Sequence, residues 1–125
     1  MPDYTNTSLV PWYGEPIKKA VIEEGITKIG QYTFANCNLL NDISISNTVT
    51  QIGEGAFYGT GFTEFTFPKN IKIIGMGAFA ECTKLQSIEL NEGLETIEAY
   101  AFQDTNIATV TLPATSIEFG TDAFL

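Results

Sequence analysis

The amino-acid sequence predicts a right-handed, β-rich solenoid of about five coils, because two patterns recur along almost the whole chain. The first is a hexapeptide, found as IGQYTF (29–34), IGEGAF (52–57), IGMGAF (74–79), IEAYAF (97–102) and FGTDAF (119–124). The Phe residues that close these hexapeptides are 22 or 23 residues apart. The second is an apolar pattern, L-x-x-I-x-L, between successive hexapeptides. A repeat this short cannot bury its apolar face alone, so successive repeats stack and bury it against their neighbours.

Each apolar pattern predicts one short strand per coil, because alternating Ile, Val, Phe and Thr residues are typical of a half-buried strand. The five copies are Ile17-Ala20-Ile22, Leu40-Ile43-Ile45, Phe62-Phe65-Phe67, Leu85-Ile88-Leu90 and Ile107-Val110-Leu112. We expect the residues between the apolar ones to face outward. A second short strand is expected where V-T-x-I or its equivalent follows, as at 49–52 and 94–97.

The hexapeptides predict the turns that close the coils. Their second position is glycine in four copies, which predicts a sharp bend with positive φ at Gly30, Gly53, Gly75 and Gly120. The segment that follows is too short for a helix, and we expect a single turn of 3₁₀ type. Its small residue, Thr33 in the first copy and Ala in the others, allows neighbouring turns to approach. The Phe residues are then expected to stack as an aromatic spine.

These residues resemble a known family. IGxxAF followed by CxxLxxIxLPxxVTxIG is similar to the signature of the BspA-like leucine-rich repeats of bacterial surface proteins, and the resemblance covers residues 17–125. It implies a leucine-rich-repeat solenoid, secreted to the bacterial cell surface, that binds proteins in adhesion. The stretch MPDYTNTSLVPWYG (1–14) resembles the segment that often precedes the first repeat, and we predict that residues 1–16 cap the solenoid. The resemblance also leads us to expect a natural protein longer at both ends.

Composition narrows the function. The chain has 6 Lys and Arg residues against 15 Asp and Glu residues, a net charge of -9 and no His. Nucleic acids and anionic membranes both attract clustered positive charge, so neither is an expected partner. The absence of His removes the commonest general base and metal ligand. No apolar run approaches the roughly 20 residues that a membrane helix needs. The sequence therefore predicts no enzyme activity, no cofactor, no metal site and no membrane insertion.

Two cysteines invite three interpretations: a disulfide, a metal pair or a structural role. Cys37 and Cys82 are 45 residues apart, which places them in the same column two coils apart. At about 4.8 Å per coil they lie on the order of 10 Å apart, beyond the roughly 7 Å limit for a disulfide. We therefore predict free, buried thiols at the position that Thr60 and Thr105 occupy in other coils.

The outward residues of the predicted strands form the candidate binding face. Its members are small, polar or charged: Lys19, Asp42, Ser44, Glu64, Thr66, Ser87, Glu89, Thr109 and Thr111. Asp42 and Glu64 are expected to be neighbours about 5 Å apart at the backbone, close enough for one carboxyl to raise the pKa of the other. A solvated pair of separate charges is the simpler interpretation. The face lacks Tyr, Trp and Arg anchors, so it predicts no single binding hot spot.

Three functions remain open. The first is a non-catalytic protein-binding or adhesion module, with a host or extracellular-matrix protein as partner. The second is a structural spacer that displays another domain. The third is a carbohydrate-binding module in which Tyr4, Trp12 and Tyr13 stack on sugar, although these aromatic residues also fit a cap. The last coil exposes Val110, Leu112, Ile117, Phe119 and Phe124, which predicts either fraying of that coil or an end-to-end homodimer through it.

Overall fold

The computed structural model describes residues 16–125, which form ten short strands and no helix. The strands are β1 (Lys19–Ile22), β2 (Lys28–Ile29), β3 (Asp42–Ile45), β4 (Gln51–Ile52), β5 (Glu64–Thr66), β6 (Ile73–Ile74), β7 (Ser87–Glu89), β8 (Thr96–Ile97), β9 (Thr109–Thr111) and β10 (Glu118–Phe119). Nothing in this part of the chain is a helix that could cross a membrane. The predicted cap residues Tyr4, Trp12 and Tyr13 lie outside the described residues.

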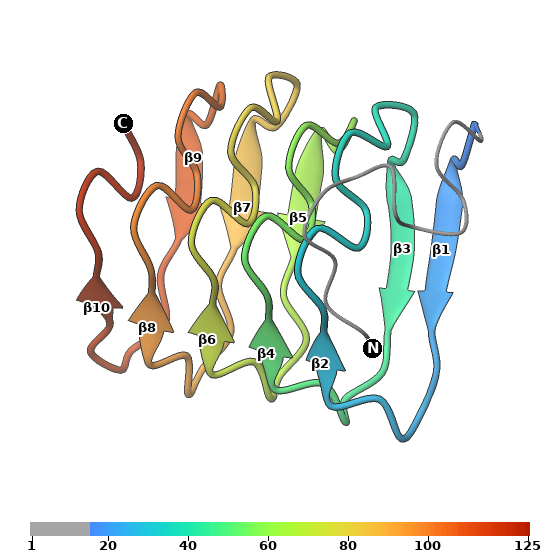
Figure 1. Ribbon diagram of the computed structural model, residues 1–125. Coiled ribbons are helices and arrows are strands. Elements are labelled where there is room, and N and C mark those ends of the chain that lie inside the picture. The colour runs from blue at the N-terminus through green and yellow to red at the C-terminus, as the bar shows by residue number, and fades with distance from the viewer. Residues whose placement is uncertain (1–15) are drawn as a thin grey trace.

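The strands alternate between two faces of a right-handed parallel solenoid, which confirms the predicted fold (Figure 1). Each coil contributes one strand to each face, so β1 and β2 belong to coil 1 and β9 and β10 to coil 5. On one face β2, β4, β6, β8 and β10 form a continuous sheet. On the other, called the strand face here, β1 pairs with β3, and β7 pairs with β5 on one side and β9 on the other. All pairs are parallel, as stacking of successive coils requires.

The predicted aromatic spine is present and runs the length of the stack. Successive rings from Phe34 to Phe124 have centroids 5.1–5.5 Å apart and planes within 11–19° of each other. Phe57, Phe79 and Phe102 are fully buried at its centre. The residue before each Phe is small, so neighbouring turns can approach closely. The Phe57 amide, for example, donates to the Ala78 carbonyl of the next coil at 2.8 Å. The same bond recurs from Phe79 to Ala101 at 2.7 Å, so the turns are hydrogen-bonded from coil to coil.

The turns differ from prediction at two points. They are successive tight turns rather than 3₁₀ helix, and positive φ occurs at the fourth hexapeptide position instead of the second. Tyr32, Gly55, Gly77, Tyr100 and Asp122 all have φ between 52° and 60°. A left-handed residue breaks the run of right-handed dihedrals that a 3₁₀ helix needs, so the helix does not form.

Glycine is needed at the second hexapeptide position for a reason other than positive φ. A Cβ atom on Gly53 would lie 2.8 Å from the Ile29 carbonyl oxygen, and one on Gly75 would lie 2.7 Å from the Ile52 oxygen. Each glycine also donates its amide to that same carbonyl, at 2.8 Å in both cases. The absence of a side chain therefore lets the backbone approach the coil before it closely enough to bond.

Candidate functional site

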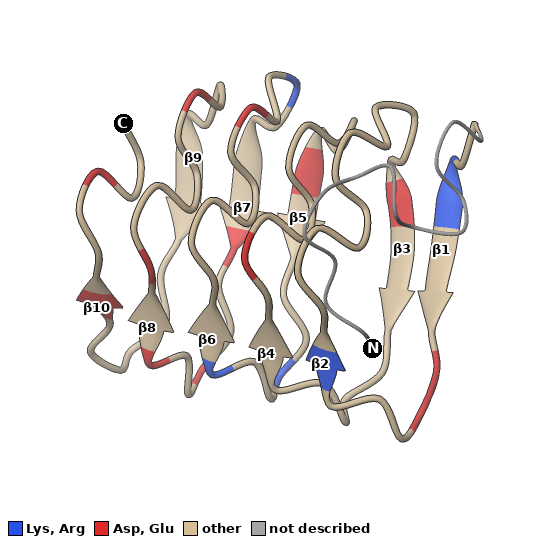
Figure 2. Ribbon diagram, in the orientation of Figure 1, with Lys and Arg blue, Asp and Glu red and all other residues tan. Residues whose placement is uncertain are grey.

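The structure places all nine candidate residues on the strand face. They lie on β1, β3, β5, β7 and β9, and all are exposed except Ser87, which is partly buried. Lys19 pairs with Asp42 in the register of β1 and β3, and their side chains lie 3.9 Å apart. Glu64, Ser87 and Thr109 align across the second sheet, as do Thr66, Glu89 and Thr111. Figure 2 shows Lys on β1 and carboxylates on β3, β5 and β7.

The sheet of the strand face is interrupted between β3 and β5, a feature called the β3–β5 gap here. The two strands belong to adjacent coils, yet they do not pair, and no Cα atom of β3 lies within 8 Å of one in β5. Paired strands lie about 4.8 Å apart. The expected 5 Å neighbour relation of Asp42 and Glu64 is therefore wrong, because their strands are separated by the gap.

Backbone groups on both sides face the gap without a partner among residues 16–125. In a parallel ladder the amide and carbonyl of successive residues point alternately to the two neighbouring strands. The Ser46 amide bonds the Ile22 carbonyl at 3.0 Å, so by alternation the backbone groups of Ile43 and Ile45 point toward β5. The Phe67 amide bonds the Glu89 carbonyl at 3.0 Å, so those of Glu64 and Thr66 point toward β3.

Side-chain volume distinguishes the coil beside the gap from its counterpart two coils later. The sequence repeats every two coils, so β7 and β9 stand in the same relation as β3 and β5, and they pair normally. The two pairs differ in their second coil, which is coil 3 for β5 and coil 5 for β9. Coil 3 has Phe62, Phe65 and Phe67 at the positions where coil 5 has the smaller apolar residues Ile107, Val110 and Leu112. Phe65 packs 4.8 Å from Phe79 and 5.6 Å from Phe57, centroid to centroid. We attribute the separation of β5 from β3 to these three rings, whose combined volume exceeds that of the residues at the same positions in coil 5.

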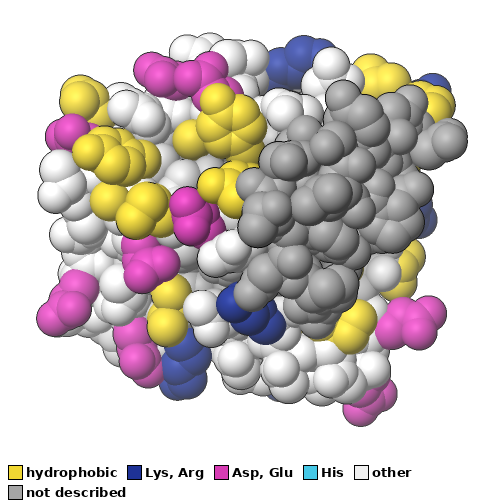
Figure 3. Space-filling view, viewed as in Figure 1, with side chains coloured by type: hydrophobic (Ala, Val, Ile, Leu, Met, Phe, Trp, Pro, Cys, Tyr) yellow, Lys and Arg dark blue, Asp and Glu magenta, His cyan; other side chains and the backbone are white. Residues whose placement is uncertain are grey.

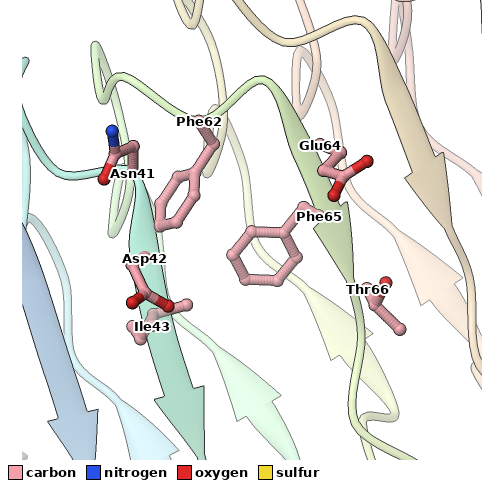
Figure 4. Close-up of a pocket in the computed structure, with 7 residues that line it drawn as sticks. All are labelled: Asn41, Asp42, Ile43, Phe62, Glu64, Phe65 and Thr66. Atoms are coloured by element: carbon pink, nitrogen blue, oxygen red, sulfur yellow. The ribbon is translucent and has the colours of Figure 1, made fainter.

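A cavity of about 240 Å³ opens at the gap (Figure 4). Its lining residues are Asn41, Asp42, Ile43, Phe62, Glu64, Phe65 and Thr66. Phe62 and Phe65, which are 2% and 4% exposed, form an apolar floor with their rings 5.0 Å apart. The carboxylates of Asp42 and Glu64 lie at the exposed rim, one on each strand. Among the described residues, the lining includes two anionic groups and no cation.

A second cavity, of about 220 Å³, lies over the turns and was not predicted from the sequence. Tyr32, Tyr58, Tyr100, Met76 and Gln103 are among its lining residues. The Tyr32 hydroxyl donates to the Glu54 carboxylate at 3.1 Å, and burial and this bond raise the pKa of Tyr32. Met76 and Tyr100 are exposed. Figure 3 shows hydrophobic side chains gathered above β6, β8 and β10 on the turn side. We call this cavity the tyrosine groove.

Both cysteines are free, as predicted. The Cys82 thiol is buried and donates to the Phe57 carbonyl at 3.0 Å, in the column that Thr60 and Thr105 share. Burial was predicted for both thiols and is wrong for Cys37, which is partly exposed because it lies in coil 1. Burial raises the pKa of Cys37 and of Cys82. Within residues 16–125, no three or more His, Cys, Asp and Glu side chains group closely enough to hold a metal ion.

Solved structures of similar shape are bacterial leucine-rich-repeat proteins. A leucine rich cell surface protein from Faecalibacterium prausnitzii A2-165 is 25% identical over 86% of this chain and 38% of its own, with a TM-score of 0.60. A leucine-rich repeat protein from Eubacterium ventriosum is 24% identical over 88% and 36%, with a TM-score of 0.67. The T. pallidum leucine rich repeat protein is 22% identical over 82% and 60%, with a TM-score of 0.59.

The chain therefore spans between 36% and 60% of the length of these structures. Comparison with curated proteins finds no match. A family model described as the BspA type leucine rich repeat region matches residues 11–125, in six copies. That match covers nearly the whole chain and agrees with the repeat, the parallel strands and the aromatic spine described above. The chain belongs to the BspA-type leucine-rich-repeat family.

Proposed function

We propose that this chain is a non-catalytic, extracellular module that binds a protein partner through its strand face and serves in bacterial adhesion. The observation that carries the proposal is the strand face itself, which presents nine small, polar or charged residues and an open, acid-rimmed cavity at its centre. The Faecalibacterium relative, described as a cell surface protein, supports the location. A host or extracellular-matrix protein is the proposed partner.

The test is binding to immobilised fibronectin, laminin, fibrinogen and collagen. Ser44→Arg and Thr111→Arg place bulky charges on β3 and β9 of the strand face, and both residues are exposed. Glu118→Arg on β10 of the opposite face is the control, and it adds more positive charge than either of the other two variants. We expect the first two variants to lose binding and the control to keep it. Equal loss in all three would assign binding to another surface, and no binding by the parent chain would favour the structural spacer instead.

The tyrosine groove favours a second candidate function, carbohydrate binding. Tyr rings stack on the apolar faces of sugars, and their hydroxyls, together with Glu54 and Gln103, offer hydrogen bonds to sugar hydroxyls. This site differs from the Tyr4, Trp12 and Tyr13 set predicted from the sequence. Sedimentation of the chain with insoluble peptidoglycan, with and without Tyr100→Ala, tests it. Binding that Tyr100→Ala abolishes would support the groove, and absence of binding by the parent chain would reject it.

End-to-end pairing through the last coil is the proposed self-association of the 125-residue polypeptide. Leu112, Phe119, Phe124 and Leu125 are 63%, 52%, 40% and 74% exposed, and all four belong to coil 5 at one end of the stack. Exposed apolar side chains concentrated in one coil favour association. A symmetric pair would bury these side chains against each other.

A further inference from the structure

We propose that the β3–β5 gap binds one extended peptide strand of a partner protein, with an Arg or Lys of that strand held between Asp42 and Glu64. This proposal deepens the protein-binding function proposed above and rests on it. It names the part of the strand face that makes the contact and the chemistry of the segment that fits there.

The width of the gap fits one strand. A strand inserted between β3 and β5 would sit about 4.8 Å from each, so it needs the two strands roughly 9.6 Å apart. Their Cα atoms are already more than 8 Å apart. The coils stay joined on either side of the gap, by the Gly61 amide bonded to the Leu40 carbonyl at 2.9 Å and by the pairing of β4 with β6. The opening is therefore fixed in place and needs little further separation.

The edges of the gap supply hydrogen bonds on both sides. The backbone groups of Ile43 and Ile45 point in from β3, and those of Glu64 and Thr66 point in from β5, as the bonds of Ser46 and Phe67 fix by alternation. An inserted strand would bond to both edges, whereas a strand added to an ordinary sheet edge bonds to one. Main-chain bonding of this kind requires an extended peptide and accepts no helix or folded surface.

Charge and shape define the side chains of that peptide. A residue aligned with Asp42 and Glu64 points outward between two carboxylates, so Arg or Lys is favoured and Asp or Glu is repelled. The only cation near the rim among the described residues is Lys19, which lies 3.9 Å from Asp42 and leaves Glu64 without a cationic partner. The next peptide residue points inward onto the apolar floor of Phe62 and Phe65, so an apolar side chain fits there. The motif is therefore basic, then apolar, then small and polar.

The decisive experiment measures binding of a blocked synthetic peptide, T-R-V-T-V, to the full chain by NMR titration. Its Arg aligns with Asp42 and Glu64, and its first Val meets the Phe floor. We expect binding of T-R-V-T-V and none of the charge-reversed T-E-V-T-V. The amide protons of Ile43, Ile45, Glu64 and Thr66 should exchange rapidly in the free chain and become protected when the peptide binds. Equal binding of both peptides, or protection of these amides without peptide, overturns the proposal.

Two variants separate the gap from general electrostatics. The triple variant Phe62→Ile, Phe65→Val, Phe67→Leu copies the residues of coil 5, which should close the gap and abolish binding. Because it removes buried rings, it serves only if its circular dichroism spectrum matches the parent. The pair Asp42→Asn and Glu64→Gln keeps the gap and should weaken binding about three- to tenfold. The pair Glu98→Gln and Glu118→Gln makes the same change of net charge away from the gap and should leave binding unchanged.

Failure of this proposal can be told from failure of the proposed function. If the triple variant loses T-R-V-T-V but still binds a matrix protein as the parent does, the gap is not the contact, and the strand face remains the binding surface. If the parent binds no T-R-V-T-V and still binds a matrix protein, the conclusion is again that the gap is not the contact and that the strand face remains the binding surface. A dimer that T-R-V-T-V dissociates would make a second copy of the chain the occupant, and would overturn the assignment to a partner protein.

Discussion

The Sγ atom of Cys82 lies 3.2 Å from the Oγ1 atom of Thr60 in the preceding coil, and both groups bond the carbonyl of Phe57. The carbonyl oxygen of Phe57 thus accepts hydrogen bonds from both Thr60 and Cys82, which are neighbours in a column where Cys and Thr alternate from coil to coil. The thiol of Cys82 has a hydrogen-bond partner and no route to solvent. The thiol of Cys37, at the same position in coil 1, is partly exposed.

We therefore expect the two thiols to differ in reactivity. Titration of the native chain with a disulfide reagent should modify Cys37 slowly and Cys82 only after denaturation. Burial raises the pKa of both thiols above the ordinary 9.0, and the thiolate is the reactive form. The rate at Cys37 should therefore increase with pH toward that raised pKa. In the Cys37→Ser variant, any reaction under native conditions would contradict the burial of Cys82.

The aromatic spine should be strongest at its centre. Phe79→Ala removes a fully buried ring between Phe57 and Phe102 and should lower the free energy of unfolding by about 3–5 kcal/mol. Phe124→Ala removes a ring that is 40% exposed and stacked on one side only, so its loss should be under about 2 kcal/mol. Urea denaturation of both variants makes the comparison. Equal losses in the two variants would contradict the expectation that the buried centre of the spine stabilises the protein more than its exposed end.

The carboxyls of Glu81 and Asp104, in adjacent turns, should make stability depend on pH. A hydrogen bond to Asp104, with smaller contributions from desolvation and charge repulsion, raises the pKa of Glu81 above the ordinary 4.5. A raised pKa in the folded state gives stability that is present below 4.5 and is lost as pH rises through the raised value. Melting temperatures of the parent and of Glu81→Gln, followed from acidic to neutral pH, should therefore diverge in that window. Parallel curves would rule out the interaction.

Self-association should depend on the apolar end of the stack. In sedimentation experiments the 125-residue polypeptide should dimerise, and Phe119→Lys, at a ring that is 52% exposed, should dissociate the dimer. Val21→Lys changes a similarly exposed residue, 58%, on β1 in coil 1 and should leave association unchanged. A parent chain that stays monomeric at every concentration, with slow amide exchange in the last coil, would exclude both pairing and fraying.

The spacing between equivalent residues of successive repeats predicted most of the fold. Because each coil is stacked in register, the pairing of Lys19 with Asp42 and of Ser87 with Thr109 follows from residue spacing alone. The same arithmetic failed at Asp42 and Glu64, since it counts residues and ignores volume. The sequence does show that coil 3 differs from the others: it alone has Phe at all three inward positions of its strand pattern, 62, 65 and 67.

The conformation of the turns was harder to predict from the sequence than the strands. Two of the five hexapeptides have Gly at the fourth position, Gly55 and Gly77, which is a direct sign of a left-handed residue there. Tyr32 and Tyr100 obscured it, because a bulky side chain rarely adopts positive φ. The same two residues form part of the tyrosine groove, so the strained backbone position and the missed aromatic cluster are one feature.

The missing ladder between β3 and β5 also has a mechanical consequence. If the solenoid is pulled from its two ends, every junction between coils carries the same load. The junction of coils 2 and 3 shares that load among fewer backbone bonds, because it has no ladder on the strand face. The turns, the β4–β6 pair, the Gly61–Leu40 bond and the Asn70 side chain, which donates to the Asn47 carbonyl at 2.7 Å, are among the contacts that cross it. Under tension, as on a tether in flowing liquid, the molecule should part there first. A peptide strand lodged in the opening would bridge the weak junction and raise the rupture force.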